Sequence, residues 1–191
     1  MNRLVIMTVG KTHSGKTTFA KALEKEMQNS VVIDQDNHAE FLNTYYPVLL
    51  PIQEQPNLIK CALTKTIVQY AIDETNCHLI LCNSNRNRKS RLKLLKQYHN
   101  KGFTSILVNF DVPEHILKER IAKSNRSKAV LRTASTFEEV LIRQGEEANK
   151  EDVTAPLKDE ANHLFIIQHP DAVRSIIRKI RKLAYNLEIL N

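Results

Sequence analysis

The segment from Gly10 to Thr17 carries the strongest chemical signal in the chain. Its sequence, Gly-Lys-Thr-His-Ser-Gly-Lys-Thr, fits the pattern G-x-x-x-x-G-K-S/T in full. The two glycines let the backbone curl around a phosphate with its N–H groups pointing inward. In this pattern the lysine, Lys16, reaches the β- and γ-phosphates of a nucleotide, and the hydroxyl of Thr17 binds Mg²⁺. The segment therefore predicts a phosphate-binding loop for ATP·Mg²⁺.

The residues on either side of this loop support the prediction. Residues 4–9 form a continuous apolar run that is typical of a buried strand. Residues 16–27 place apolar side chains at helical spacing, at Phe19, Ala20, Leu23 and Met27. A helix that starts here directs its positive N-terminal end at the same phosphate. A chance match in a turn would leave this strand–loop–helix context unexplained.

A pair of carboxylates follows the second apolar run. Residues 31–33 lead into Asp34-Gln35-Asp36, and the carboxyl end of a parallel strand faces the ligand crevice. A carboxylate there can accept the proton of an attacking hydroxyl, and Asp36 is the candidate for this role. Two alternatives stay open: a helix N-cap for residues 38–43, and a phosphatase-like D-x-D pattern, although Asn37 and His38 do not suit the second.

The third run, residues 78–82, ends in the polar stretch Asn83-Ser84-Asn85-Arg86-Asn87. A phosphate-loop protein usually carries an aspartate at this point to hold Mg²⁺, whereas Asn83 has no charge. We therefore expect the metal to depend on Thr17, on the phosphates, and on Asp34 or Asp36. An ordinary polar loop is the alternative interpretation.

A basic segment follows the fourth run. Residues 105–110 lead to Pro113, which marks a helix start, and the helix ends in a stretch rich in arginine and lysine. We interpret residues 124–133 as a lid, in which Arg126 or Arg132 neutralises charge on the transferred phosphoryl group. A solvated helix end is the alternative.

The alternation of strands and helices predicts an α/β protein with three layers, a parallel sheet of five strands and helices on both faces. Residues 164–167 form the fifth strand. The chain shows no linker or repeat, so residues 1–191 form one domain. The predicted helices are residues 16–27, 58–73, 88–100, 114–122, 137–148 and 172–187.

The composition sets the broad class. The chain has 191 residues and a net charge of +7, which suits anionic partners. No apolar stretch approaches the length of a membrane span, which is roughly 18 residues. Cys61, Cys77 and Cys82 lack the spacing of a metal site, and we expect buried, reduced thiols in a cytoplasmic protein.

Several of these motifs together resemble P-loop kinases of the polynucleotide-kinase-like and zeta-toxin-like branch, above all the 5′-hydroxyl polynucleotide kinase domain of phages. The resemblance covers about residues 1–145. It rests on the phosphate-binding loop, on residues 32–36, on Asn83-Ser84-Asn85 followed by Arg91, on residues 110–113, and on the arginines of the lid.

The resemblance implies the strand order 2-3-1-4-5, a catalytic aspartate at Asp36, and an arginine at Arg120 that packs on adenine. The chain departs from the pattern at Asn83, where the family has an aspartate, and at Ala39, where polynucleotide kinases have a substrate-binding arginine. This branch also phosphorylates sugars, nucleosides and other small hydroxyl compounds, so the fold does not fix the acceptor.

We therefore expect an ATP-dependent phosphotransferase that acts on a small hydroxyl compound or on a 5′-hydroxyl nucleic-acid end. The candidate catalytic residues are Lys16, Asp36 and Arg126. The candidate nucleotide-binding residues are Gly10, Lys11, Thr12, His13, Ser14, Gly15, Lys16, Thr17, Thr18 and Arg120, with Thr17 also on the metal.

Two alternatives stay open. One is a nucleotide-binding regulator or ATPase, which the uncharged Asn83 would suit. The other is a kinase that binds nucleic acid, through the basic cluster Arg86, Arg88, Lys89, Arg91, Lys93 and Lys96, or through the last helix. For these two basic segments, a solvated face and amphipathic packing are the simpler interpretations.

Overall fold

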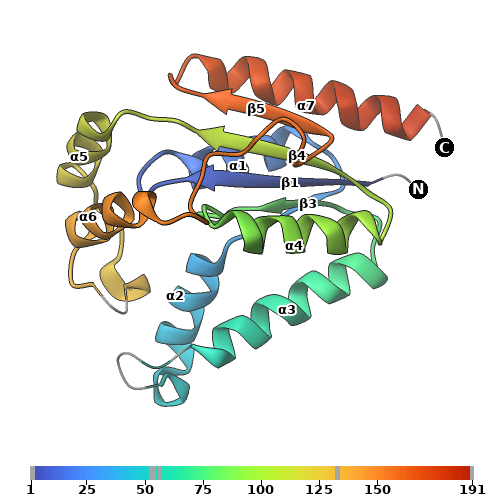
Figure 1. Cartoon of the computed structure of the whole chain (residues 1–191). Coiled ribbons are helices and arrows are strands. Elements are labelled where there is room, and N and C mark those ends of the chain that lie inside the picture. The colour runs from blue at the N-terminus through green and yellow to red at the C-terminus, as the bar shows by residue number, and fades with distance from the viewer. Residues whose placement is uncertain (1–2, 52–54, 56, 132–133, 190–191) are drawn as a thin grey trace.

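The computed structural model describes residues 3–51, 55, 57–131 and 134–189. Within them, five strands form one parallel sheet in the order β2-β3-β1-β4-β5 (Figure 1). This arrangement confirms the predicted P-loop fold and the strand order that the resemblance implied. The strands are β1 (Arg3–Gly10), β2 (Ser30–Ile33), β3 (His78–Leu81), β4 (Phe103–Phe110) and β5 (His163–Ile167).

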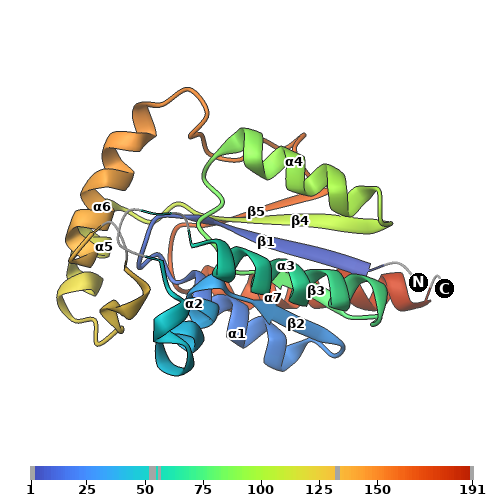
Figure 2. The same ribbon diagram turned by 90° about the horizontal axis from the view of Figure 1, so that it is seen from below.

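Helices cover both faces of the sheet (Figure 2). Helices α1 and α7 pack on one face, and α3 and α4 pack on the other. The α-helices are α1 (Lys16–Glu26), α2 (Gln35–Tyr45), α3 (Leu58–Asp73), α4 (Arg88–His99), α5 (Glu114–Ala122), α6 (Phe137–Glu146) and α7 (Ala172–Ile189). Three short 3-10 helices, η1 (Pro47–Leu49), η2 (Lys128–Val130) and η3 (Glu147–Asn149), lie among the connections.

Strand β1 lies at the centre of the sheet, between β3 and β4. The side chains of Leu4 and Ile6 pack into the core under α1 and α7, while those of Val5 and Met7 pack under α3 and α4. All four are completely buried. Because both faces of the strand are covered, its sequence is continuously apolar instead of alternating.

Helix α2 starts earlier than the sequence suggested, at Gln35 and not at residue 38. The carboxylate of Asp34 accepts a hydrogen bond from the backbone N–H of Asp36, at 2.9 Å, and so caps the first turn. The N-cap interpretation of this acidic pair is therefore correct for Asp34, and it places Asp36 in the first turn of the helix.

The prediction that the basic cluster forms a solvated helix face is wrong for Arg91, because its side chain is completely buried. Its guanidinium makes two hydrogen bonds to the carboxylate of Glu160, at 2.7 and 3.1 Å. It also donates to the backbone oxygens of Asn85 and Arg86, at 2.9 and 3.1 Å. Arg91 therefore holds the loop after β3, and a buried cation of this kind needs its partner acid.

Replacing Arg91 with alanine is expected to lower the free energy of unfolding by about 3–5 kcal/mol, because Glu160 would keep its buried charge without this partner. Urea denaturation measures the change. Lys93→Ala, an exposed change on the same helix, is the matched control and should stay within about 0.5 kcal/mol of the wild type. A similar small loss for Arg91→Ala would contradict a stabilising role for the pair.

The three cysteines differ in their exposure to solvent. Cys82 is buried as expected, whereas Cys77 is half-buried and Cys61 is exposed. The expectation of a buried thiol is wrong for Cys61, because it lies on the solvent side of α3. No helix among the described residues is both long and apolar enough to cross a membrane.

Candidate active site

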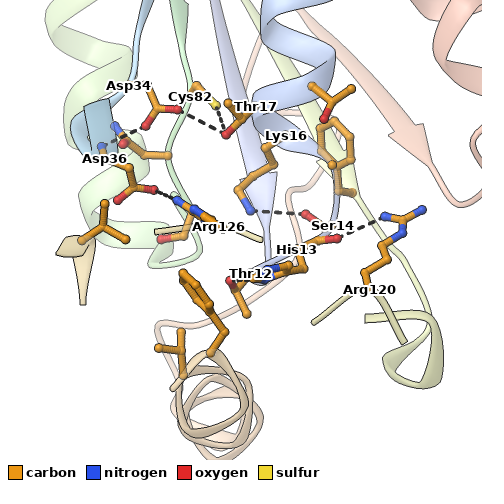
Figure 3. A pocket seen from close by; sticks show the side chains of 18 of the residues that line it. Thr12, His13, Ser14, Lys16, Thr17, Asp34, Asp36, Cys82, Arg120 and Arg126 are labelled. Atoms are coloured by element: carbon orange, nitrogen blue, oxygen red, sulfur yellow. Dashed lines mark hydrogen bonds and ion pairs between the residues drawn. The ribbon is translucent and has the colours of Figure 1, made fainter. Parts of the chain in front are cut away.

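The phosphate-binding loop connects the end of β1 to the start of α1 (Figure 3). Its two glycines have positive φ angles, 152° at Gly10 and 101° at Gly15. A Cβ atom at Gly10 would lie 3.0 Å from the Cβ and the backbone oxygen of Phe110 and from the hydroxyl of Ser14. Glycine at this position is therefore required both by the backbone angle and by the close approach of β4.

Lys16 is the first residue of α1, and its side chain lies across the loop. Its Nζ atom donates hydrogen bonds to the backbone oxygen of Lys11, at 2.5 Å, and to the hydroxyl of Ser14, at 3.2 Å. Burial lowers the pKa of Lys16 to about 8. Burying a cation next to N–H groups is costly without an anion, so this arrangement suits a phosphate.

Thr17 and Asp34 place two oxygen-bearing side chains next to each other beside Lys16. The hydroxyl of Thr17 donates to the carboxylate of Asp34 at 3.2 Å, and Asp34 is only 2% exposed. The described residues contain no group of three histidine, cysteine or acidic side chains that could hold a metal by themselves. Mg²⁺ normally takes one or two protein oxygens together with phosphates and waters, so this small donor set fits it.

Asn83, at the end of β3, lies at the same edge of the sheet. Its side-chain oxygen accepts a hydrogen bond from the backbone N–H of Gln35 at 3.4 Å. The neighbouring loop residues support the phosphate-binding loop, because the N–H of Gly10 donates to the backbone oxygen of Ser84 at 3.0 Å. The loop after β3 is therefore part of the site and not an unrelated polar loop.

Asp36 forms an ion pair with Arg126 across the pocket. The two residues are 90 positions apart in the chain, and Arg126 belongs to the predicted lid. The guanidinium of Arg126 also lies 5.1 Å from the ring centroid of Phe137, at the start of α6. The fold thus brings the candidate base and the candidate lid arginine together, while Arg132, the other lid candidate, lies outside the described residues.

His13 connects the phosphate-binding loop to the lid. Its Nε2 atom lies 2.9 Å from the hydroxyl of Ser124, and its ring packs edge-on against Phe137 with the centroids 4.7 Å apart. His13 has a positive φ angle of 55°. Its pKa is lowered, first by burial and then by the positive charges of Arg126 and Lys16, so the ring is biased towards the neutral form.

The other predicted nucleotide-binding residues have different surroundings. Arg120 donates to the backbone oxygen of His13 at 3.1 Å, on the side of the loop away from Asp36. Thr18 lines the pocket from the first turn of α1. The side chain of Lys11 turns to α5, where it pairs with Glu114 at 3.3 Å.

Sequence reasoning missed a residue that supports the loop from α6. The side-chain oxygen of Gln144 accepts a hydrogen bond from the backbone N–H of Thr12 at 2.8 Å. Arg86 in turn donates to the backbone oxygen of Gln144. No local pattern could reveal this contact, because Gln144 lies 132 positions after the residue it supports.

These residues surround one pocket of about 900 Å³. Residues 12–17 of the phosphate-binding loop line it. Asp36 and Arg120 lie on opposite sides of Lys16 (Figure 3). On the side of Asp36 the lining includes Asn37, Glu40 and Lys60. A volume of this size accommodates a ligand of the size of a nucleotide and leaves polar groups at one side.

The fold and this site define a P-loop nucleotide-binding protein. More particularly, the chain belongs to the AAA domain family, whose model matches residues 5–145. Among curated proteins no match to the sequence is found.

Several solved structures share the fold over almost the whole chain. Kti12 of Chaetomium thermophilum, solved with ADP-AlF3, has 17% sequence identity and a TM-score of 0.60, with 92% of this chain and 96% of that chain covered.

 APS kinase CysC of Mycobacterium tuberculosis, solved with AMPPNP and APS, has 17% identity and a TM-score of 0.56, with 97% of this chain and 99% of that chain covered. Shikimate kinase of Bacteroides thetaiotaomicron has 15% identity and a TM-score of 0.55, with 95% and 98% covered. At these identities the likeness shows the fold alone.

Proposed function

We propose that the protein is a kinase that transfers the γ-phosphoryl group of ATP to a hydroxyl of a small molecule. The observation that carries this proposal is the position of Asp36. Its carboxylate lines the same pocket as Lys16, and it pairs there with Arg126 of the predicted lid. A phosphate-binding loop alone would serve any nucleotide-binding protein, whereas a carboxylate placed beside it can serve an acceptor hydroxyl.

In the proposed reaction, Lys16 and the N–H groups of the loop hold the β- and γ-phosphates. The acceptor hydroxyl lies next to Asp36, which takes its proton as the oxygen forms a bond to the γ-phosphorus. The bond between this phosphorus and the bridging oxygen breaks, and ADP is the leaving group. Thr17 and Asp34 would hold Mg²⁺, which neutralises charge on the phosphates when it is bound.

The lid has a second role in this proposal. Arg126 pairs with Asp36 in the structure, and the same guanidinium is within the pocket that the γ-phosphate would enter. When ATP binds, the phosphate offers Arg126 a stronger partner than an exposed carboxylate. Arg126 would then move to the phosphoryl group and leave Asp36 free to accept the proton.

Two of the structurally similar proteins, APS kinase and shikimate kinase, bear names that describe small acceptors, which supports a small molecule here. The test is ADP formation by the purified protein with ATP and Mg²⁺, against sugars, sugar acids, nucleosides and 5′-hydroxyl oligonucleotides. ADP formation that depends on a small acceptor is the expected result. Turnover with oligonucleotides alone would replace the proposed substrate class.

The same panel of acceptors also tests the alternative hypothesis that the protein is a nucleotide-binding regulator. Tight ATP binding without turnover on any acceptor would overturn the kinase proposal. Asn83→Asp would then be the informative variant, because it restores a charged group at the end of β3, beside the N–H of Gln35.

A further inference from the structure

Two basic segments of the protein differ in what surrounds their cations. At the start of α4, Arg88 and Arg91 both pair with the carboxylate of Glu160, and Arg86 pairs with Glu147. Helix α7 carries five exposed cations, Arg174, Arg178, Lys179, Arg181 and Lys182. Within the described part of the chain, an ion pair is found for Arg181 alone, with Glu26 at 3.2 Å. The charge of α4 is thus largely neutralised at its start, and that of α7 is not.

The cations of α7 are ordered along the helix. One stripe on α7 follows the spacing i, i+4, i+7, i+11 and consists of Arg174, Arg178, Arg181 and Tyr185. With helical geometry, these side chains leave the helix within an arc of about 60° around its axis and span about 16 Å along it. We call these four residues the arginine stripe. Lys179 and Lys182 extend the same exposed face. The described side chains of α7 include no acid that would offset this charge.

The apolar side of α7 is fully used inside the protein. Ile176, Ile177, Ile180 and Ala184 are at most 5% exposed and pack with α1 and the sheet. Figure 1 shows α7 along one side of the molecule, with its outer face turned away from the sheet. The arginine stripe therefore lies on a helix that is rigidly anchored, which lowers the cost of ordering a binding surface.

We propose that this face of α7 binds the phosphodiester backbone of a nucleic acid. Guanidinium groups make paired hydrogen bonds to phosphate, and a row of them matches a row of phosphates better than a single anion. Tyr185, which is 62% exposed, offers a ring for stacking a base at the end of the stripe. An anionic membrane suits this face less well, because helices that bind membranes insert an apolar side, and that of α7 is buried.

This surface is separate from the proposed acceptor side of the pocket. The pocket is lined by Val173, which precedes the arginine stripe, but by none of the four residues of the stripe itself. Asp36 lies on the other side of Lys16 from Arg120. A nucleic acid on α7 therefore need not be the phosphoryl acceptor. The inference goes beyond the proposed kinase activity, and either one can fail without the other.

The test is binding of the full chain, without ATP, to fluorescent single-stranded RNA and duplex DNA of about 20 units, measured by anisotropy over a range of salt concentrations. The double variant Arg174→Glu/Arg178→Glu is expected to weaken binding by at least about tenfold. It should also reduce the salt slope for single strands by about 1.4, which is about 0.7 for each lost phosphate contact. ATP binding should not change.

The matched control is Lys93→Glu/Lys96→Glu on α4, which alters two exposed cations and changes the net charge by the same amount. It should leave most of the binding intact. Equal weakening by both double variants would show attraction by net charge alone and overturn the proposal. Absence of binding to either nucleic acid, or α7-dependent binding to phosphatidylserine vesicles alone, would also overturn it. If the charge reversal prevents folding, Arg174→Gln/Arg178→Gln is compared with Lys93→Gln/Lys96→Gln, which changes the net charge by the same amount.

Discussion

Replacing Lys16 with alanine is expected to abolish turnover of ATP and to weaken ATP binding by roughly 10- to 100-fold. The physical reason is the loss of charge-assisted hydrogen bonds to the β- and γ-phosphates, each of which contributes about 1.5–3 kcal/mol. Isothermal titration with ATP·Mg²⁺ measures the affinity, and ADP formation measures the turnover.

Lys25→Ala is the matched control for this change. Lys25 is an exposed lysine on the same helix, α1, and lies outside the pocket. The Lys25→Ala variant should therefore bind ATP with the affinity of the wild type. Turnover of the Lys16→Ala variant at the wild-type rate would refute the assignment of the phosphate-binding loop.

The second large effect is expected at Asp36. Asp36→Asn should retain ATP binding and lower the rate of phosphoryl transfer by about 10²-fold or more, the range for a positioned general base. The amide keeps the shape of the side chain but does not take a proton from the acceptor. Single-turnover transfer to the acceptor that the panel identifies is the appropriate measurement.

Glu40→Gln provides the comparison, because Glu40 lies one turn further along α2 and lines the same pocket. We expect a much smaller loss of rate from this variant. If Asp36→Asn instead lost its affinity for ATP·Mg²⁺ and kept its rate at saturation, Asp36 would act on the metal, together with Asp34, and not as the base.

The strands and the phosphate-binding loop could be predicted because their signals are local, whereas the strand order came from the resemblance to P-loop kinases. The continuous apolar run of β1 indicates a strand that is buried on both faces. The glycines Gly10 and Gly15 indicate backbone angles that other residues rarely adopt. The helix start at Gln35 was missed because it depends on one side chain, that of Asp34, which caps the helix from the strand end.

The contacts that join distant segments could not be predicted. Arg91 looked like one more cation on a solvated helix, since nothing near it in sequence shows that Glu160 will cover it. Gln144 carries no motif, and its hydrogen bond to Thr12 exists only because α6 folds back over the loop. The pairing of Asp36 with Arg126 likewise depends on how the lid segment crosses the pocket.

The ion pair of Arg91 also defines what the smallest folding unit must contain. Glu160 lies between α6 and β5, after every residue proposed for nucleotide binding, yet its carboxylate neutralises an arginine that holds the loop after β3. A fragment that ended after α6 would leave this arginine buried without its counter-ion and would expose β4 as an unprotected edge strand. The last strand and helix are thus an internal scaffold for the site, and truncated versions of the protein made for crystallography or engineering should keep them.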